Sequence, residues 1–458
     1  MTGAPIALGV SETPLSPTRI CIDGFNLGLS KGSGIATYAR NLNDSLRAIG
    51  LQTQILYGPD TRLDHDNRLN EIALHDAPRP PGPLWRRSLA RVGRLSRTAT
   101  SVLGRKARPI APTGDIVLGP GQVTADTTWA ARDLYHSAGL AFSWHRRFTP
   151  ISFAASDDAS RPEAMHWTCP LPLTVKEVPN LYTIHDLIPL SLPYATLDNK
   201  RAYHALCARI CATADQVVTV SETSRADIIR MFGVHEDRIT NTYQAVDVPR
   251  ALRDRPEADV GRELESVFDL SWRGYFLFFG AIEPKKNLSR LIEAYLTAGV
   301  SAPLVIVGAG GWLDRQETAL LQDGLTGEWS LVDGAVRRTD RVRRYDYLPF
   351  AMLVSLIRGA RAVLFPSLYE GFGLPVLEAM QLGAPVLAST GGALPEVAGD
   401  AAMLVDPFDV EAIRKSIVAL DADGGLRDQL TQRGRARCET FSPEAYRAHL
   451  STLYARIA

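Results

Sequence analysis

Two carboxylates flank a short glycine-containing loop in the C-terminal half of the chain. Glu370 precedes Gly371-Phe372-Gly373, and Glu378 follows it with seven residues between the two acids. Glycine lets backbone come close to a ligand, and a helix beginning at the loop offers free N–H groups and a positive dipole end to an anion. Either acid alone is more typical of a surface or capping residue. Both acids around one such loop favour a functional site, where Glu378 could accept hydrogen bonds from sugar hydroxyls.

The elements that would position this loop form a strand–loop–helix–strand unit. The apolar run 362–365, closed by Pro366, predicts a buried parallel strand. Pro375 fits the first turn of a helix, which Gly383 would end. A second apolar strand is expected over 385–388.

A pair of lysines occupies another strand-to-helix loop. Lys285 and Lys286 follow an expected strand over 275–279 and precede a helix that begins at Leu288. Two ammonium groups in such a loop suit a diphosphate. A solvated basic turn would have the same composition.

A histidine and an aspartate follow a third expected strand. His185 and Asp186 come directly after the strand expected over 180–184. Open α/β sheets place their ligands at the carboxyl ends of their strands. An isolated histidine is more often a core residue, but this position favours a site.

A glycine-containing loop over 24–34 joins an expected strand, 19–23, to a helix that begins near Ile35. Such a loop lets phosphate approach the backbone, which makes Gly34 a candidate phosphate contact. The loop lacks the third glycine of a dinucleotide fingerprint and is too long for one. Taken alone, this signal is weak.

Together these motifs resemble the retaining glycosyltransferase superfamily often numbered family four, which has the GT-B fold. The loop residues that match its E-x7-E signature are Glu370, Gly371, Phe372, Gly373, Leu374, Pro375 and Glu378. The T-I-H-D-L-I-P run around His185 is most similar to mannosyl-type members. One departure is Ala281, where many members have an arginine.

The resemblance implies a role for each site residue. In that family the residue matching Glu370 contacts the donor sugar beside the reacting carbon, and the residue matching Glu378 holds the ribose hydroxyls. His185 would lie at the reaction centre. The other donor contacts implied are Gly34, Lys285, Lys286, Gly371, Phe372, Gly373 and Leu374. Because lysines and the helix start would neutralise the leaving diphosphate, no metal and no other cofactor is expected.

The implied function is retaining transfer of a hexose from a nucleotide sugar to a saccharide or lipid-linked acceptor. The resemblance favours mannose from GDP-mannose, for a cell-surface polysaccharide or lipopolysaccharide. The sequence itself fixes neither the sugar nor the acceptor. Rival functions are a nucleotide-sugar epimerase or a phosphorylase on the same fold, and a non-catalytic scaffold. A phosphorylase would need a Schiff-base lysine, which we cannot identify, and the missing fingerprint disfavours an NAD dehydrogenase.

Length and composition agree with a two-domain α/β protein. The chain has 458 residues, 45% apolar and 22% charged, with 50 basic and 50 acidic side chains. This balance gives no indication of nucleic-acid binding. Five cysteines without a C-x-x-C pair, and no long apolar run, predict a cytoplasmic location.

The expected fold is GT-B, with two doubly wound Rossmann-like domains that face each other across a cleft and a C-terminal helix that crosses back to the first domain. The expected divisions are a disordered tail over 1–17, an acceptor-binding domain over 18–250, a linker over 251–274, a nucleotide-sugar-binding domain over 275–440 and the returning helix over 441–458.

A basic segment over 85–108 is the least expected feature. It contains seven arginines, one lysine and no acid, and at helical spacing its apolar residues fall opposite most of its arginines. Such a helix suits an anionic membrane surface and could hold the enzyme on the inner face of the plasma membrane. The same pattern also fits a helix that packs on the domain with its arginines in water.

Two D-x-D sequences, 64–66 and 421–423, resemble metal-binding motifs of another glycosyltransferase fold. No apolar strand leads into either of them. We interpret both as solvated loop charges.

Overall fold

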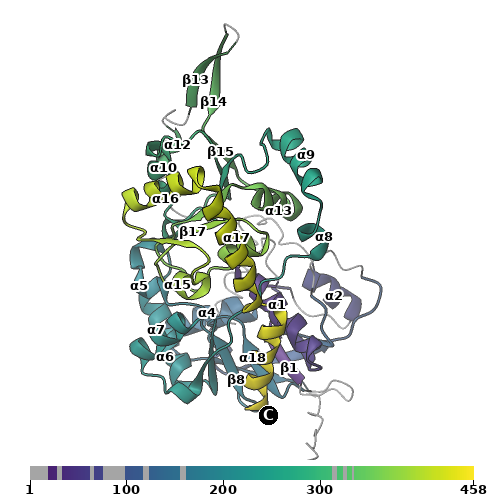
Figure 1. Ribbon diagram of the computed structural model, residues 1–458. Coiled ribbons are helices and arrows are strands. Elements are labelled where there is room, and N and C mark those ends of the chain that lie inside the picture. Colours follow the sequence, from purple (N-terminus) through teal and green to yellow (C-terminus); the bar gives the residue numbers. More distant parts are fainter. Residues whose placement is uncertain are drawn as a thin grey trace, which may run out of the picture.

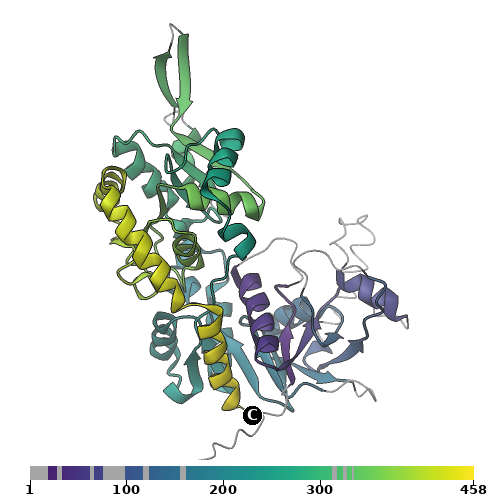
Figure 2. The same ribbon diagram turned by 45° about the vertical axis from the view of Figure 1, so that its right-hand side comes forward.

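Two α/β domains, each built on a mainly parallel sheet, make up the protein (Figures 1 and 2). The computed structural model describes residues 19–27, 34–61, 66–75, 98, 100–116, 123–154, 161–311, 317–322, 327–332 and 335–457. The GT-B architecture expected from the sequence is confirmed.

The first domain has a ten-stranded sheet in the order β10-β9-β8-β6-β1-β2-β4-β3-β5-β7. All neighbouring strands are parallel except β3 and β4. The strands are β1 (Arg19–Asp23), β2 (Gln52–Tyr57), β3 (Arg105–Ile110), β4 (Thr127–Ala130), β5 (Thr149–Phe153), β6 (Ala164–Trp167), β7 (Leu173–Val175), β8 (Asn180–Thr183), β9 (Gln216–Thr219) and β10 (Ile239–Asn241). The helices of this domain are α1 (Gly34–Ala48), α2 (Asn67–His75), α4 (Leu134–His145), α5 (Ile188–Ser191), α6 (Lys200–Thr213) and α7 (Glu222–Phe232).

The second domain has a six-stranded parallel sheet in the order β15-β12-β11-β16-β17-β18. The strands are β11 (Phe276–Phe279), β12 (Leu304–Val307), β15 (Val342–Tyr345), β16 (Ala362–Phe365), β17 (Val386–Ser389) and β18 (Met403–Val405). The helices are α10 (Leu288–Thr297), α12 (Ala319–Gln322), α13 (Phe350–Gly359), α14 (Leu374–Gln381), α15 (Leu394–Ala398), α16 (Val410–Ala422) and α17 (Gly424–Glu439), with a 3-10 turn η3 (Pro284–Lys286).

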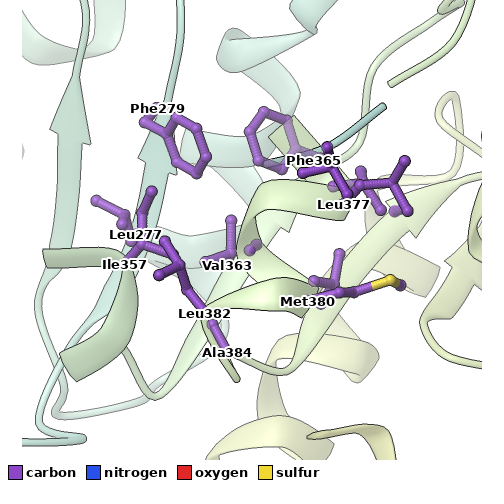
Figure 3. Packing of buried hydrophobic residues seen from close by; sticks show 14 of the residues in the cluster. Leu277, Phe279, Ile357, Val363, Phe365, Leu377, Met380, Leu382 and Ala384 are labelled. Atoms are coloured by element: carbon purple, nitrogen blue, oxygen red, sulfur yellow. The ribbon is translucent and has the colours of Figure 1, made fainter. Parts of the chain in front are cut away.

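The central strands of this second sheet are buried along their whole length. Every residue of β11, β12, β16 and β17 is buried, because helices cover both faces of a parallel sheet. Val363 and Phe365 of β16 pack in one cluster with Leu377 of α14 and Leu277 of β11 (Figure 3). A buried side chain of this kind contributes about 1.5–3 kcal/mol. The loops that follow these strands therefore start from a rigid base.

Helix occupies much of the stretch that the sequence pattern suggested as a linker. It contains α8 (Arg250–Arg253) and α9 (Glu257–Phe268). Val260, Leu264 and Phe268 lie on one face of α9 and are buried in the large hydrophobic cluster. This amphipathic face packs α9 against α13 of the second domain.

The last helix returns to the first domain, as expected. α18 (Pro443–Ala455) leaves the second domain after α17 and packs against α1 (Figure 2). The Tyr454 hydroxyl lies 2.5 Å from Nδ1 of His166 in β6. The C-terminus is thus anchored in the core of the first domain.

The prediction of one helix over 85–108 is wrong at its C-terminal end. Residues 76–97 and 99 lie outside the described part, but Arg105–Ile110 form β3, which pairs with β4 and β5. Gly104 adopts a φ of 113°, which ends the preceding turn. Lys106 and Arg108 are exposed while Ala107 is buried. Burial therefore alternates from one residue to the next here, as in a strand, and does not follow the helical spacing expected from the sequence.

A hairpin that the sequence did not predict projects from the second domain. Its strands are β13 (Gly327–Val332) and β14 (Ala335–Asp340), and Figure 1 shows it extending beyond the helices. Within the described residues, none of the helices has both the length and the apolar character needed to cross a bilayer.

Candidate active site

The loop after β16 carries the first signature acid, Glu370, in a fixed backbone conformation. The Glu370 carbonyl accepts a hydrogen bond of 2.9 Å from the Ala393 N–H. Gly392 has a φ of 63°, and a Cβ at this position would lie 2.3 Å from the Glu370 carbonyl oxygen. Only glycine fits this contact, so the loop before α15 holds Glu370 in place.

Glu370 forms a buried ion pair with Lys286. The Lys286 Nζ atom lies 2.6 Å from Oε1 of Glu370, and both residues are 8% exposed. Burial would raise the pKa of Glu370, but Lys286 and then Lys285 bring it below its ordinary value. Glu370 is therefore a charged carboxylate at neutral pH. The structure brings together two residues 84 positions apart that the sequence singled out separately.

The neighbouring Lys285 is bound to the same loop. Its carbonyl accepts a 2.7 Å hydrogen bond from the Leu368 N–H, and its Nζ lies 3.2 Å from Glu283. Burial would lower the pKa of Lys285, but the Glu370 and Glu283 carboxylates raise it above its ordinary value. Two cationic groups thus stand beside Glu370.

The second signature acid, Glu378, lies inside α14 and is partly buried. Burial raises its pKa to about 7. Among the residues that the structure describes, its carboxylate has no hydrogen-bond or ion-pair partner. It is therefore a partly buried acceptor that hydroxyl groups of a ligand could satisfy.

The turn between the two acids presents backbone rather than side chains. Gly373 has a φ of 105° and precedes Leu374, the first residue of α14. The Phe372 ring is buried and packs edge-on against Phe441, with ring centroids 5.5 Å apart. Phe372 therefore anchors the loop through its side chain, which leaves only its backbone available for a ligand.

His185 lies at the carboxyl end of β8, in the first domain. Its Nε2 atom is 2.8 Å from the Thr168 carbonyl oxygen, so Nε2 carries the proton. Burial lowers the pKa of His185, which is therefore neutral at pH 7 and keeps Nδ1 as an acceptor. The Tyr38 ring meets the imidazole edge-on at 4.8 Å.

Gly371 brings the two domains into direct contact. A Cβ at Gly371 would lie 2.8 Å from the His185 carbonyl oxygen and 2.8 Å from Cβ and Oδ2 of Asp186. The strand end that carries His185 therefore touches the loop that carries Glu370. Gly34 is the first residue of α1, and a Cβ there would meet nothing within 4 Å, so it faces open space rather than a close backbone contact.

Asp23 is a buried residue that the sequence reasoning missed. It ends β1, and its carboxylate accepts hydrogen bonds from the N–H groups of Thr168 and Phe25. Burial raises its pKa to about 6. The Thr168 carbonyl is also the hydrogen-bond partner of His185, so Asp23 helps to position the histidine through Thr168. The rule that selected His185, a polar residue at the end of a buried strand, would also have found it.

No group of three or more His, Cys, Asp or Glu side chains in the described part of the chain is placed to hold a metal ion. Asp64 and His65 of the first D-x-D sequence lie outside that part.

Two family profiles match the chain, one in each domain. The family described as "Glycosyltransferase Family 4" matches residues 126–250, and the family described as "Glycosyl transferases group 1" matches residues 271–437. The second range contains the Glu370 loop and both lysines.

Curated relatives include O-antigen chain mannosyltransferase B of Escherichia coli, 35% identical over 57% of this chain and 66% of that protein. The serotype-specific mannosyltransferase WbdA of Escherichia coli is 30% identical over 58% of this chain and 32% of that protein. The matches thus span just under two thirds of the first relative and one third of the second.

Solved structures share the whole fold at low sequence identity. Sucrose-phosphate synthase from Thermosynechococcus elongatus has a TM-score of 0.63 at 18% identity, covering 96% of this chain and 98% of that one. HepE from Anabaena, in complex with UDP and glucose, has a TM-score of 0.60 at 15% identity, covering 96% and 100%.

Proposed function

Because the chain belongs to the glycosyltransferases that join a family 4 domain to a group 1 domain, we propose that it transfers a hexose from a nucleotide sugar, with retention of configuration. The observation that carries this proposal is the buried Lys286–Glu370 pair at 2.6 Å, on a loop that touches the His185 strand end. A scaffold would have no need for a buried ion pair at an interdomain contact. Such a pair brings little net stability.

The donor site lies in the second domain. Lys285 and Lys286 bind the diphosphate, supported by the N-terminal end of α14. Glu378 accepts hydrogen bonds from the ribose hydroxyls, and Glu370 accepts one from the donor sugar. The backbone between Gly371 and Leu374 completes the contacts to the sugar and phosphate.

The reaction takes place between the domains. As the diphosphate leaves, the acceptor hydroxyl attacks the anomeric carbon from the same face, and its proton passes to a phosphate oxygen. Lys286 has three donors, so it can hold the leaving phosphate while still bound to Glu370. Neutral His185 accepts a hydroxyl hydrogen bond at Nδ1, and thereby orients the donor sugar. No step requires a metal ion.

We assign mannose from GDP-mannose as the preferred donor, and a lipid-linked or saccharide acceptor of cell-surface polysaccharide. Two of the relatives carry the name mannosyltransferase, and one of these names refers to the O-antigen chain. A hydrolysis and transfer screen with GDP-, UDP- and dTDP-sugars tests this assignment. Preference for a UDP- or dTDP-sugar would refute the mannose assignment while leaving the glycosyltransferase proposal intact.

The basic segment over 85–108 would hold the enzyme on an anionic membrane surface. Its arginine-rich composition supports this proposal. Co-sedimentation with anionic vesicles is the test, and reversal of Arg86, Arg87, Arg91 and Arg94 to glutamate should abolish it. Unchanged binding of the reversed variant would refute the proposal.

Changing each of the two signature acids to alanine should impair a different step: turnover for Glu370 and donor binding for Glu378. Glu370→Ala should lower kcat at least about a hundredfold with a small change in donor KM, because its contact strengthens in the transition state. Glu378→Ala should raise donor KM or Kd about tenfold or more, because it holds the ribose. Steady-state kinetics and nucleotide titration separate the two effects.

Glu265→Ala is the matched control, since this glutamate is exposed on α9, which packs against the second domain. Wild-type transfer by both site variants would refute the proposed active site. Isomerisation of the nucleotide sugar without transfer would favour the epimerase instead.

A further inference from the structure

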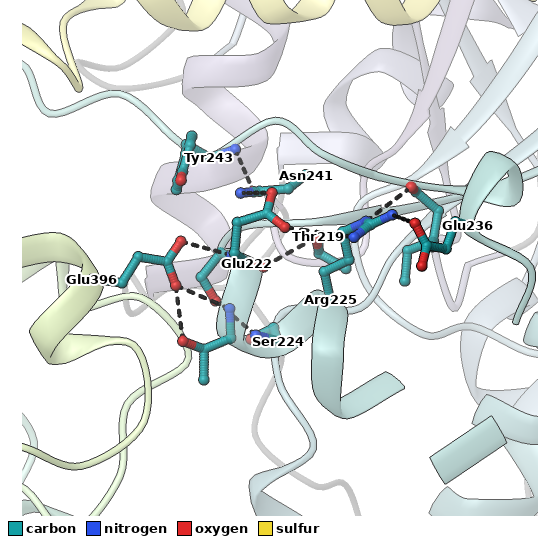
Figure 4. Close-up of polar contacts among 11 residues, drawn as sticks. Thr219, Glu222, Ser224, Arg225, Glu236, Asn241, Tyr243 and Glu396 are labelled. Carbon is teal, nitrogen blue, oxygen red and sulfur yellow. Dashed lines mark hydrogen bonds and ion pairs between the residues drawn. The ribbon is translucent and has the colours of Figure 1, made fainter. Parts of the chain in front are cut away.

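A carboxylate from the second domain caps a helix of the first domain. Glu396 of α15 accepts hydrogen bonds from the N–H groups of Glu222 (2.7 Å) and Thr223 (2.9 Å), and from the Thr223 hydroxyl (2.8 Å) (Figure 4). These residues begin α7, 174 and 173 positions away in sequence. The contact therefore joins the two domains directly.

The start of α7 depends on this contact for its hydrogen bonding. The first N–H groups of a helix have no partner inside the helix. Ser221 caps Ser224 at 3.0 Å, so the N–H groups of Glu222 and Thr223 remain for Glu396. A charged acceptor at the positive end of the helix dipole makes these bonds stronger than neutral ones.

The other charges near this contact are already paired. The Glu222 carboxylate accepts 2.9 Å from Asn241 Nδ2 and lies 3.7 Å from Arg225, which also reaches Glu236 at 3.4 Å (Figure 4). The Glu222 side chain therefore does not compete with Glu396 for the helix start.

The same end of α7 also holds the Glu370 loop. The Ser221 hydroxyl donates 2.7 Å to the Gly371 carbonyl. The Ser224 hydroxyl lies 2.8 Å from the His185 carbonyl and 3.3 Å from that of Gly371. One serine thus bridges the two backbones that meet at the candidate reaction centre.

A further bond lies deeper along α7. Tyr369, directly before Glu370, donates a hydrogen bond from its hydroxyl to the buried Asp227 carboxylate. In the described part of the chain, hydrogen bonds thus join α7 and its N-cap to Tyr369, Gly371 and Glu396 of the second domain.

We propose that Glu396 is a positioning residue that holds the two domains closed, so that the Glu370 loop lies against the His185 strand end. It acts through α7 and touches no substrate. Without the Glu396 carboxylate, the N–H groups of Glu222 and Thr223 would bind water instead. The hydrogen bonds of Ser221, Ser224 and Tyr369 between the domains would then break more readily. The kinetic consequence rests on the proposed glycosyltransferase function, but the effect on domain closure does not.

The direct test is an interdomain distance measured by paired spin labels. Arg201 of α6 and Glu293 of α10 are exposed, one in each domain, and all five native cysteines are buried, so R201C/E293C can be labelled selectively. Glu396→Ala should shift the distance distribution to longer values, and Thr223→Val should shift it less. Glu411→Ala is the matched control, because Glu411 pairs with Arg414 inside its own helix. An unchanged distribution in Glu396→Ala would overturn the proposal.

Kinetics then distinguishes positioning from a general loss of structure. Glu396→Ala should lower kcat at least about tenfold while Kd for GDP or UDP, measured by calorimetry, stays within about twofold, because the diphosphate contacts lie within the second domain. A parallel fall in nucleotide affinity and kcat would also refute the proposal. If wild type transfers no sugar, the proposed function fails while the distance measurement still decides the role of Glu396.

Discussion

The protonation state of a buried side chain in this protein depends on whether it has a charged partner. Glu370 and Glu378 are both glutamates of one signature. The lysines keep the pKa of Glu370 below its ordinary value, whereas burial alone raises that of Glu378 to about 7. The same residue type is thus a fixed anion at one position and a titrating group at the other.

Glu378 makes a prediction about stability and pH. Its pKa in the folded protein, about 7, is above the ordinary value of 4.5, so the folded state holds the proton more tightly than the unfolded state. This contribution is complete below pH 4.5 and is lost as pH rises through about 7. Glu378→Gln should therefore be more stable than wild type by about 1–3 kcal/mol at pH 8, and equally stable near pH 4.

Urea unfolding of both proteins across this pH range measures the difference. The exposed Glu265→Gln is the control and should show no such rise with pH. A wild type that is as stable as Glu378→Gln at pH 8 would contradict a partly buried carboxylate that has no partner among the described residues.

Among the elements, helix α18 connects the two domains, because it follows the second domain in sequence and packs on the first. Its Tyr454 reaches His166 in the first sheet, and Nε2 of that histidine lies 2.8 Å from the Thr183 hydroxyl. The Tyr38 hydroxyl of α1 meets the same Thr183 at 2.9 Å. A buried polar network therefore connects α18 to β6, β8 and α1, the last two of which border His185.

Tyr454→Phe should destabilise the protein by about 1–3 kcal/mol, because it leaves a nitrogen of buried His166 without a partner. Burial lowers the pKa of His166 to about 3, so protonation cannot offset the loss at neutral pH. Denaturant midpoints provide the measurement. Tyr194→Phe, an exposed tyrosine of the first domain, should have no effect. Equal stability of Tyr454→Phe and wild type would argue against the network.

At the scale of the whole molecule, the two domains share hydrophobic packing as well as polar contacts. One cluster of buried residues runs from Ile20 and Leu42 of the first domain to Phe276 and Leu364 of the second. Two domains that share buried surface, with the helix that follows the second packed on the first, are expected to unfold together.

Calorimetry should therefore show a single unfolding transition for the full chain. A nucleotide at 100 times its Kd should stabilise the whole protein by about 2.7 kcal/mol, because it binds only the folded state. Scanning calorimetry with and without GDP measures both quantities. Two separate transitions, with only one shifted by the nucleotide, would contradict this coupling.

The sequence by itself determined the elements whose signals are local. Apolar runs predicted the buried strands β8, β11, β16 and β17, and Pro375 with Gly383 predicted the two ends of α14. These predictions were right because side-chain spacing and capping act within a few residues. The motif residues were found in the same way.

Tertiary structure alone decided what these residues contact. The strands from β4 to β7 were missed, since their registers depend on partners elsewhere in the chain, as when β4 pairs with β2. The hairpin β13–β14 was also missed, although its two strands pair with each other. The pairing of Lys286 with Glu370 and the capping of α7 by Glu396 join residues 84 and 174 positions apart. No local pattern encodes such contacts, because the burial and charge that give them their strength arise only when folding brings the two residues of each pair together.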